Sequence, residues 1–220
     1  MNMRTTMNAA RLIPALLAVS ALGGAPRGAA GAEILVEAPM AAENKRTAFR
    51  KSMRKLWAEH AIWTRAYIVA AAAGTPDTAA AASRLLRNQR EIGAAFVPYY
   101  GDETGAKLGR LVKEHVLIGA DLLAALKKGD ENKRRTADRL WQENAVELAA
   151  LLDAANPHWP KQAYEEMFRH HLALTARQMT ARLGKKWEED IAAFDEAYSE
   201  ILTMADDLAD GMIKQFPEKI

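Results

Sequence analysis

Residues 107–130, KLGRLVKEHVLIGADLLAALKKGD, contain the pattern that decides the fold class. Apolar residues recur there every three or four positions, which places them on one face of an α-helix that packs against a core. The run ends at Gly129-Asp130, a break typical of the connection between two helices. The apolar positions are Leu108, Leu111, Val112, Ile118, Leu122, Leu123 and Leu126.

The same spacing extends along the chain in both directions, interrupted by short segments rich in Gly and Pro. No segment shows the sustained alternation of β-branched residues that is typical of strands. Because short connections make sequential helices antiparallel, we expect an all-α fold, an up-and-down bundle of six helices. The predicted helices cover residues 44–73, 77–96, 103–128, 131–155, 161–183 and 186–215.

The composition excludes several classes of protein. The chain has 220 residues, of which 50% are hydrophobic and 26% charged, and this balance is typical of a globular protein. The absence of Cys excludes disulfides, thiolate metal sites, iron–sulfur clusters and a Cys nucleophile. The length suits one ordinary domain with a sizeable core.

Residues 1–32 have the three parts of an export signal. Arg4 and Arg11 form a basic region, residues 12–22 are apolar, and Ala30-Gly31-Ala32 is a small-residue cleavage site. We therefore expect cleavage after Ala32 and a periplasmic or secreted protein. Residues 33–43 would then form an N-terminal arm, and residues 44–217 a single helical-bundle domain.

The signal also changes the charge of the chain. The whole sequence has a net charge of +2, but residues 1–32 contain three Arg and no acidic residue. Without them the chain has 27 basic and 28 acidic residues, which gives no electrostatic reason to bind nucleic acid or an anionic membrane. No later apolar run reaches the roughly 20 residues of a membrane span, so none is expected in the mature form.

Three histidines recur at nearly equal spacing. His60, His115 and His171 are 55 and 56 residues apart, and each has apolar residues at positions −4, −3 and +3. These offsets share one helical face, so each imidazole should lie in the middle of the stripe that faces the core. The spacing predicts three quasi-repeated antiparallel hairpins.

Polar residues recur on the second helix of each predicted hairpin. Asn88 and Asn144 are each followed three residues later by a Glu, Glu91 or Glu147, and Glu200 takes the corresponding place in the third hairpin. Each of these residues and its histidine are about 14 residues from the turn between them, which is ~21 Å along a helix. A polar layer should therefore cross the middle of the bundle.

This layer allows two interpretations. Buried imidazoles are usually satisfied within the protein, so the layer could be a metal-free network of hydrogen bonds in a non-catalytic structural or interaction protein. Alternatively, His60, His115 and His171 bind a transition metal such as Zn, Cu, Fe or Ni. Glu91, Glu147 or Glu200 could then complete the coordination, and Asn88 and Asn144 could orient the ligands.

Catalytic signatures are scarce in this sequence. It contains no Gly-x-Ser-x-Gly elbow, no phosphate-binding Gly-rich loop and no His-Glu-x-x-His motif. The Glu-x-x-His motif of di-iron bundles is missing too. General acid–base catalysis by the three histidines is a weaker hypothesis, so the sequence favours a protein that is not an enzyme.

Several segments resemble a family of small all-helical bacterial proteins of uncharacterised function. The resemblance covers roughly residues 53–217 and brings no established functional residues. Some relatives carry an acetylglutamate kinase label, which implies an α/β fold with Gly-rich nucleotide loops that this sequence lacks. The segments are LWAEHAIWTRAYI, RNQREIGAAFVPYYG, EHVLIGADLLAALKKGD, WQENAVELA, ANPHWP and MADDLADGMIKQFP.

Overall fold

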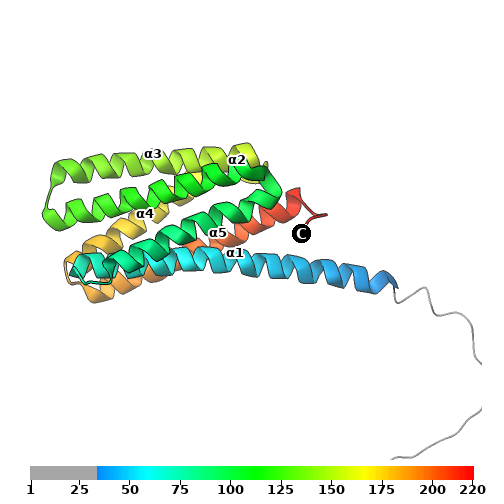
Figure 1. The fold of residues 1–220 in the computed structure, drawn as a ribbon, viewed down its shortest axis with the longest axis horizontal. Coiled ribbons are helices and arrows are strands. Elements are labelled where there is room, and N and C mark those ends of the chain that lie inside the picture. The colour runs from blue at the N-terminus through cyan, green and yellow to red at the C-terminus, as the bar shows by residue number, and fades with distance from the viewer. Residues whose placement is uncertain (1–33) are drawn as a thin grey trace, which may run out of the picture. The chain divides into compact units, whose positions relative to one another are not determined.

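The structure, a computed structural model, describes residues 34–220 and is all-helical over that range (Figure 1). The predicted all-α class is therefore confirmed for these residues, none of which forms a strand. The predicted signal, residues 1–32, lies outside the described part of the chain. The helices are α1 (Ile34–Ala73), α2 (Thr78–Lys128), α3 (Glu131–Ala155), α4 (Lys161–Leu183) and α5 (Trp187–Gln215).

The helix boundaries agree closely with the sequence pattern after residue 128. α3 and α4 have the predicted bounds, and α5 begins one residue later than predicted. α1 begins at Ile34 rather than at residue 44, so most of the expected arm is helical. Residues 39–220 form one compact unit, and residues 34–38 belong to a separate one.

The prediction of six helices is wrong for the described range, which contains five. The helices expected at 77–96 and 103–128 are joined in α2, whose only non-helical residue is Gly101, with φ 81° and ψ 169°. Glycine adopts a positive φ without steric cost, so this single residue changes the chain direction and no separate loop is needed. Pro98, inside α2, removes one helical hydrogen bond just before the bend.

The two halves of α2 pack against each other at glycines. A Cβ atom built on Gly93 would lie 2.7 Å from the carbonyl oxygen of Gly105 and 2.8 Å from the Cα of Gly109. The two backbones are thus too close for a side chain at position 93. This close approach folds the second half of α2 back toward the first and places His115 inside the bundle.

Ion pairs show how α5 packs against its neighbours. Arg50 and Arg65 on α1 pair with Asp210 and Asp190 on α5, at 2.7 and 3.0 Å, so α1 and α5 are antiparallel. Asp190 is only 1% exposed and also contacts Arg182 of α4 at 3.3 Å. This carboxylate therefore joins three helices at one end of the bundle.

One contiguous apolar core fills the bundle, and the three histidines lie within it. α2 packs on α3, α3 on α4, and α4 on α5, as Figure 1 shows. Among the helices of the described range, none is long and apolar enough to cross a membrane. The largest side chains with less than 2% exposure are Trp159, Phe96, Met53, Ile68, Leu85, Ile92, Leu111, Leu123, Leu172, Met204, Leu208 and Met212.

Candidate functional site

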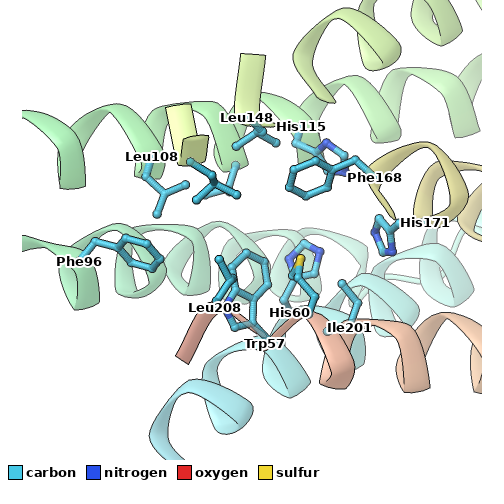
Figure 2. A pocket seen from close by; sticks show the side chains of 13 residues that line it. Trp57, His60, Phe96, Leu108, His115, Leu148, Phe168, His171, Ile201 and Leu208 are labelled. Atoms are coloured by element: carbon cyan, nitrogen blue, oxygen red, sulfur yellow. The ribbon is translucent and has the colours of Figure 1, made fainter. Parts of the chain in front are cut away.

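Three imidazoles from three helices meet inside the bundle. His60 of α1, His115 of α2 and His171 of α4 are 5%, 7% and 8% exposed. Figure 2 shows them grouped at one end of a cavity, with Phe96 and Leu108 toward the other end. The expectation that all three rings face the core is confirmed.

The rings are close neighbours. The ring centroid of His171 lies 6.2 Å from that of His60 and 6.0 Å from that of His115. The planes of His115 and His171 differ by 28°, so these two rings are nearly stacked. His171 is thus within contact range of both other histidines, which makes it the centre of the layer.

The present spacing is wider than that of a metal-bound set. Two imidazoles on one tetrahedral ion, with bonds of about 2 Å, have ring centroids about 5 Å apart. In the described part of the chain, no group of three or more His, Asp or Glu side chains is already arranged to hold a metal ion. The two centroid distances from His171 are therefore about 1 Å longer than in shared coordination.

Burial keeps two of the imidazoles neutral. Desolvation, followed by the proximity of His171, lowers the pKa of His60 to about 3, although the side chain of Gln89 opposes the shift. The pKa of His115 is lowered to about 3 by desolvation, then by His171 and His60, against the effect of its hydrogen bond to Asn144. At neutral pH both rings carry a free lone pair, the form that binds metal ions.

Asn144 fixes the tautomer of His115. Its Nδ2 donates to the carbonyl oxygen of Leu111 at 3.1 Å, which leaves Oδ1 as an acceptor. His115 Nδ1 lies 2.9 Å from that Oδ1 and therefore donates its proton to it. The lone pair of His115 is then on Nε2.

Asn88 makes the corresponding backbone bond but does not contact His60. Its Nδ2 donates to the carbonyl oxygen of Leu56 at 3.0 Å, and its Oδ1 accepts a bond from Gln89 at 3.2 Å. His60 Nδ1 has no hydrogen-bond partner among the residues that the structure describes. The predicted orienting role is therefore supported by geometry for Asn144 and not for Asn88, whose amide makes its hydrogen bonds with Leu56 and Gln89.

Glu200 connects the layer to the surface. Its Oε1 accepts a hydrogen bond of 2.7 Å from Nδ1 of His170, whose side chain is 64% exposed. Its Oε2 lies 3.7 Å from Nδ1 of the buried His171. The sequence analysis did not include His170, although its position next to His171 places it at the edge of the same helical face.

Glu91 and Glu147 do not join the layer. Glu91 pairs with Arg87 at 3.2 Å and with Arg84 at 3.4 Å. Glu147 is exposed and lines a surface groove between α2 and α3. Their spacing from Asn88 and Asn144 is regular, but three residues along a helix turn the side chain about 60° away from the asparagine, which is enough to take it out of the core.

Small cavities surround the three rings. One, bounded by Thr64, Thr175 and Gln178 beside two of the histidines, offers about 10 Å³ to the centre of a water-sized sphere. Thr64 Oγ1, Gln178 Nε2 and Nδ1 of His171 are buried there without a partner in the described chain. Such polar atoms can bind ordered water or an added ligand.

Replacing Asn144 by Ala is expected to destabilise the protein by about 2–3 kcal/mol. The change leaves the Nδ1–H of His115 buried without an acceptor and opens a small cavity. Urea unfolding followed by circular dichroism measures the loss. Asn132, exposed on the same helix, is the matched control, and its replacement by Ala should change stability by less than about 0.5 kcal/mol. Equal losses in the two variants would contradict the role given to Asn144.

No known protein family, curated protein or solved structure gives a significant match to this chain. The resemblance to the helical bacterial family therefore stays a prediction. Function must be argued from the site itself.

Proposed function

We propose that this protein binds a transition-metal ion through His60, His115 and His171. The observation that carries the proposal is the meeting of three buried imidazoles, with centroids 6.0 and 6.2 Å apart, from three different helices. Imidazole nitrogen suits Zn, Cu, Fe and Ni. A movement of about 1 Å would bring His171 to coordination distance from either of its two neighbours, and helices in a packed bundle shift by such amounts on ligand binding.

The surroundings of the rings support this proposal. Two of the imidazoles are neutral because their pKa values are lowered to about 3, so no proton must be removed before a metal binds at neutral pH. The hydrogen bond from His115 to Asn144 is of the kind that orients metal-bound histidines in proteins. Glu200, with Oε2 unpartnered in the described chain and near His171, is a further possible ligand.

Metal binding is tested by dialysing the purified protein against Zn²⁺, Cu²⁺, Ni²⁺ or Fe²⁺ and measuring bound metal. We expect about one equivalent for the parent and a loss of at least about tenfold in affinity for His171→Leu. Because Leu has a volume similar to that of His, this substitution leaves no large cavity and should preserve the fold. His158, exposed in the loop before α4, is the control, and His158→Leu should bind metal like the parent.

Thermal unfolding gives a second measure of the same site. A metal at 100 times its dissociation constant adds about 2.7 kcal/mol to the free energy of unfolding, and a chelator removes that gain. The chelator should lower the melting temperature of the parent and leave that of His171→Leu unchanged. Absence of bound metal in the parent, or equal binding by the two proteins, rejects the proposal.

A specific observation favours a second function, a metal-free structural or interaction bundle. The rings are about 1 Å farther apart than shared coordination requires, and His115 and His171 already stack. In this case the polar layer sets the register of the helices, as buried polar groups do in some coiled coils. This second function predicts a protein that is stable without metal and whose melting temperature does not change when a chelator is added.

We also propose that the bundle consists of three related hairpins and that the protein is exported. The repeat is supported by two equivalent bonds, from Asn88 to the carbonyl oxygen of Leu56 and from Asn144 to that of Leu111, in each case four residues before the histidine. Glu200 has no amide to make such a bond. Export is supported by the signal-like pattern of residues 1–32.

A further inference from the structure

An internal apolar cavity lies directly against the three histidines. Every residue on its wall is at most 8% exposed, so the cavity lies within the core of the bundle. Apart from the imidazoles and the indole N–H of Trp57, its wall is entirely apolar, as Figure 2 shows for much of it. The apolar side chains are Trp57, Phe96, Leu108, Val112, Leu148, Leu152, Phe168, Ile201, Met204 and Leu208.

The size of the cavity limits what it can hold. About 20 Å³ is open to the centre of a water-sized sphere. If this space is compact, the cavity has a radius of about 3 Å, which is sufficient for a diatomic molecule or a xenon atom. An ordinary metabolite is far too large, because small-molecule pockets start at about 300 Å³.

The polarity of the wall decides between water and an apolar guest. A buried water molecule needs two to four hydrogen-bond partners, and cavities lined by Leu and Phe stay dry. The polar atoms of this wall are the ring nitrogens of the three histidines and the indole Nε1 of Trp57. Nδ1 of His115 is bonded to Asn144, whereas Trp57 Nε1 and Nδ1 of His60 and His171 have no partner in the described chain. The end of the cavity away from the histidines, at Phe96 and Leu108, is formed by apolar side chains that offer water no hydrogen bond (Figure 2).

Access favours the same class of guest. A charged or hydrated solute would lose its hydration shell on entering a closed apolar space, at a cost of many kcal/mol. An uncharged molecule of two atoms loses little, and it can cross the bundle through the local fluctuations that all folded proteins undergo.

We propose that this cavity binds a small uncharged diatomic molecule, of the kind represented by dioxygen, and holds it against the three imidazoles. The inference goes beyond metal binding and does not depend on it, since protein side chains alone form the wall of the cavity. If a metal also binds, the same guest would lie beside it.

The test uses the metal-free full chain and two probes, xenon and dissolved dioxygen. Xenon should give a saturable change in the methyl resonances of residues on the cavity wall, Val112, Leu208 and Met204. Paramagnetic dioxygen, applied under pressure, should broaden the same resonances more than those of Leu126 or Met40, which lie off the wall. Uniform effects throughout the protein would overturn the proposal.

A matched pair of variants locates the guest. Val112→Ile adds one carbon to the cavity wall and should weaken xenon binding by about tenfold, because the added group takes up the free space. Val146→Ile makes the same change at a position that is 43% exposed on α3 and should bind xenon like the parent. Equal xenon binding by both variants would overturn the assignment to this cavity.

A resident water molecule is the main competing outcome. It would appear as a long-lived water signal near the histidines, together with an absence of saturable xenon binding in the parent, and this result would overturn the proposal. Metal binding is measured separately by dialysis, so failure of one proposal does not affect the interpretation of the other.

Discussion

Acidifying the protein from pH 6.5 to pH 5 is expected to lower its free energy of unfolding by about 3 kcal/mol. In the folded state the pKa values of His60 and His115 are both lowered to about 3, chiefly by burial, whereas in the unfolded chain they are near 6.5. Between these values the unfolded chain binds two protons that the folded protein does not. The stability that these two neutral imidazoles contribute is therefore fully present above pH 6.5 and is lost as the pH falls toward 3, with a slope that approaches about 3 kcal/mol per pH unit.

Urea unfolding at pH 7, 6 and 5 measures this dependence before most carboxylates begin to titrate. His60→Leu removes one of the two shifted groups, so its slope should be about half that of the parent. His158→Leu removes an exposed histidine and should keep the full slope. A parent protein whose stability is the same at pH 5 and pH 7 would show that these imidazoles are not held neutral by burial.

Replacing Gly93 by Ala is expected to destabilise the protein by about 3 kcal/mol. The added Cβ would lie 2.7 Å from the carbonyl oxygen of Gly105 and 2.8 Å from the Cα of Gly109. Both atoms belong to the backbone of the other half of α2, so no side-chain rotation relieves the contact. The two halves must separate, which also disturbs the position of His115.

Gly109→Ala provides a control with the opposite sign. Its Cβ would lie 3.5 Å from the Cα of Gly93, an ordinary contact, so the higher helix propensity of Ala should stabilise the protein by up to about 1 kcal/mol. Thermal and urea unfolding of the two variants measure the difference. Similar stability in both would mean that the halves of α2 do not pack as closely as described.

The helical class and most helix boundaries could be predicted because they depend on local patterns. Apolar spacing of three to four residues identifies a helix whatever it packs against, and Gly129-Asp130 ends one helix and begins the next through its own backbone and side chain. Indeed Gly129 has φ 67°, and Asp130 caps α3 by accepting a bond from the backbone N–H of Lys133. The predicted number of helices was wrong because a single non-helical residue, Gly101, takes the place of the expected loop in α2.

The three histidines of the candidate site could be predicted from the sequence, but the polar side chains that contact them could not. The burial of His60, His115 and His171 follows from their apolar neighbours at helical spacing, which is a property of each helix alone. Which polar side chain reaches each ring depends on the relative rotation of two helices, and a shift of one residue turns a side chain by about 100°. The structure therefore selects Asn144 and Glu200 and leaves Glu91 and Glu147 outside.

The sequence by itself determined that the chain is helical from about residue 44, that its helices pack through one apolar face, and that three histidines lie on that face. Only the tertiary structure decided that His171 lies about 6 Å from both other rings, that Asn144 orients one of them, and that a largely apolar cavity lies beside them. The physical reason is that helix formation and amphipathicity are set by neighbours in the chain. Contacts between rings, and the gaps left between them, are set by how complete helices fit together in three dimensions.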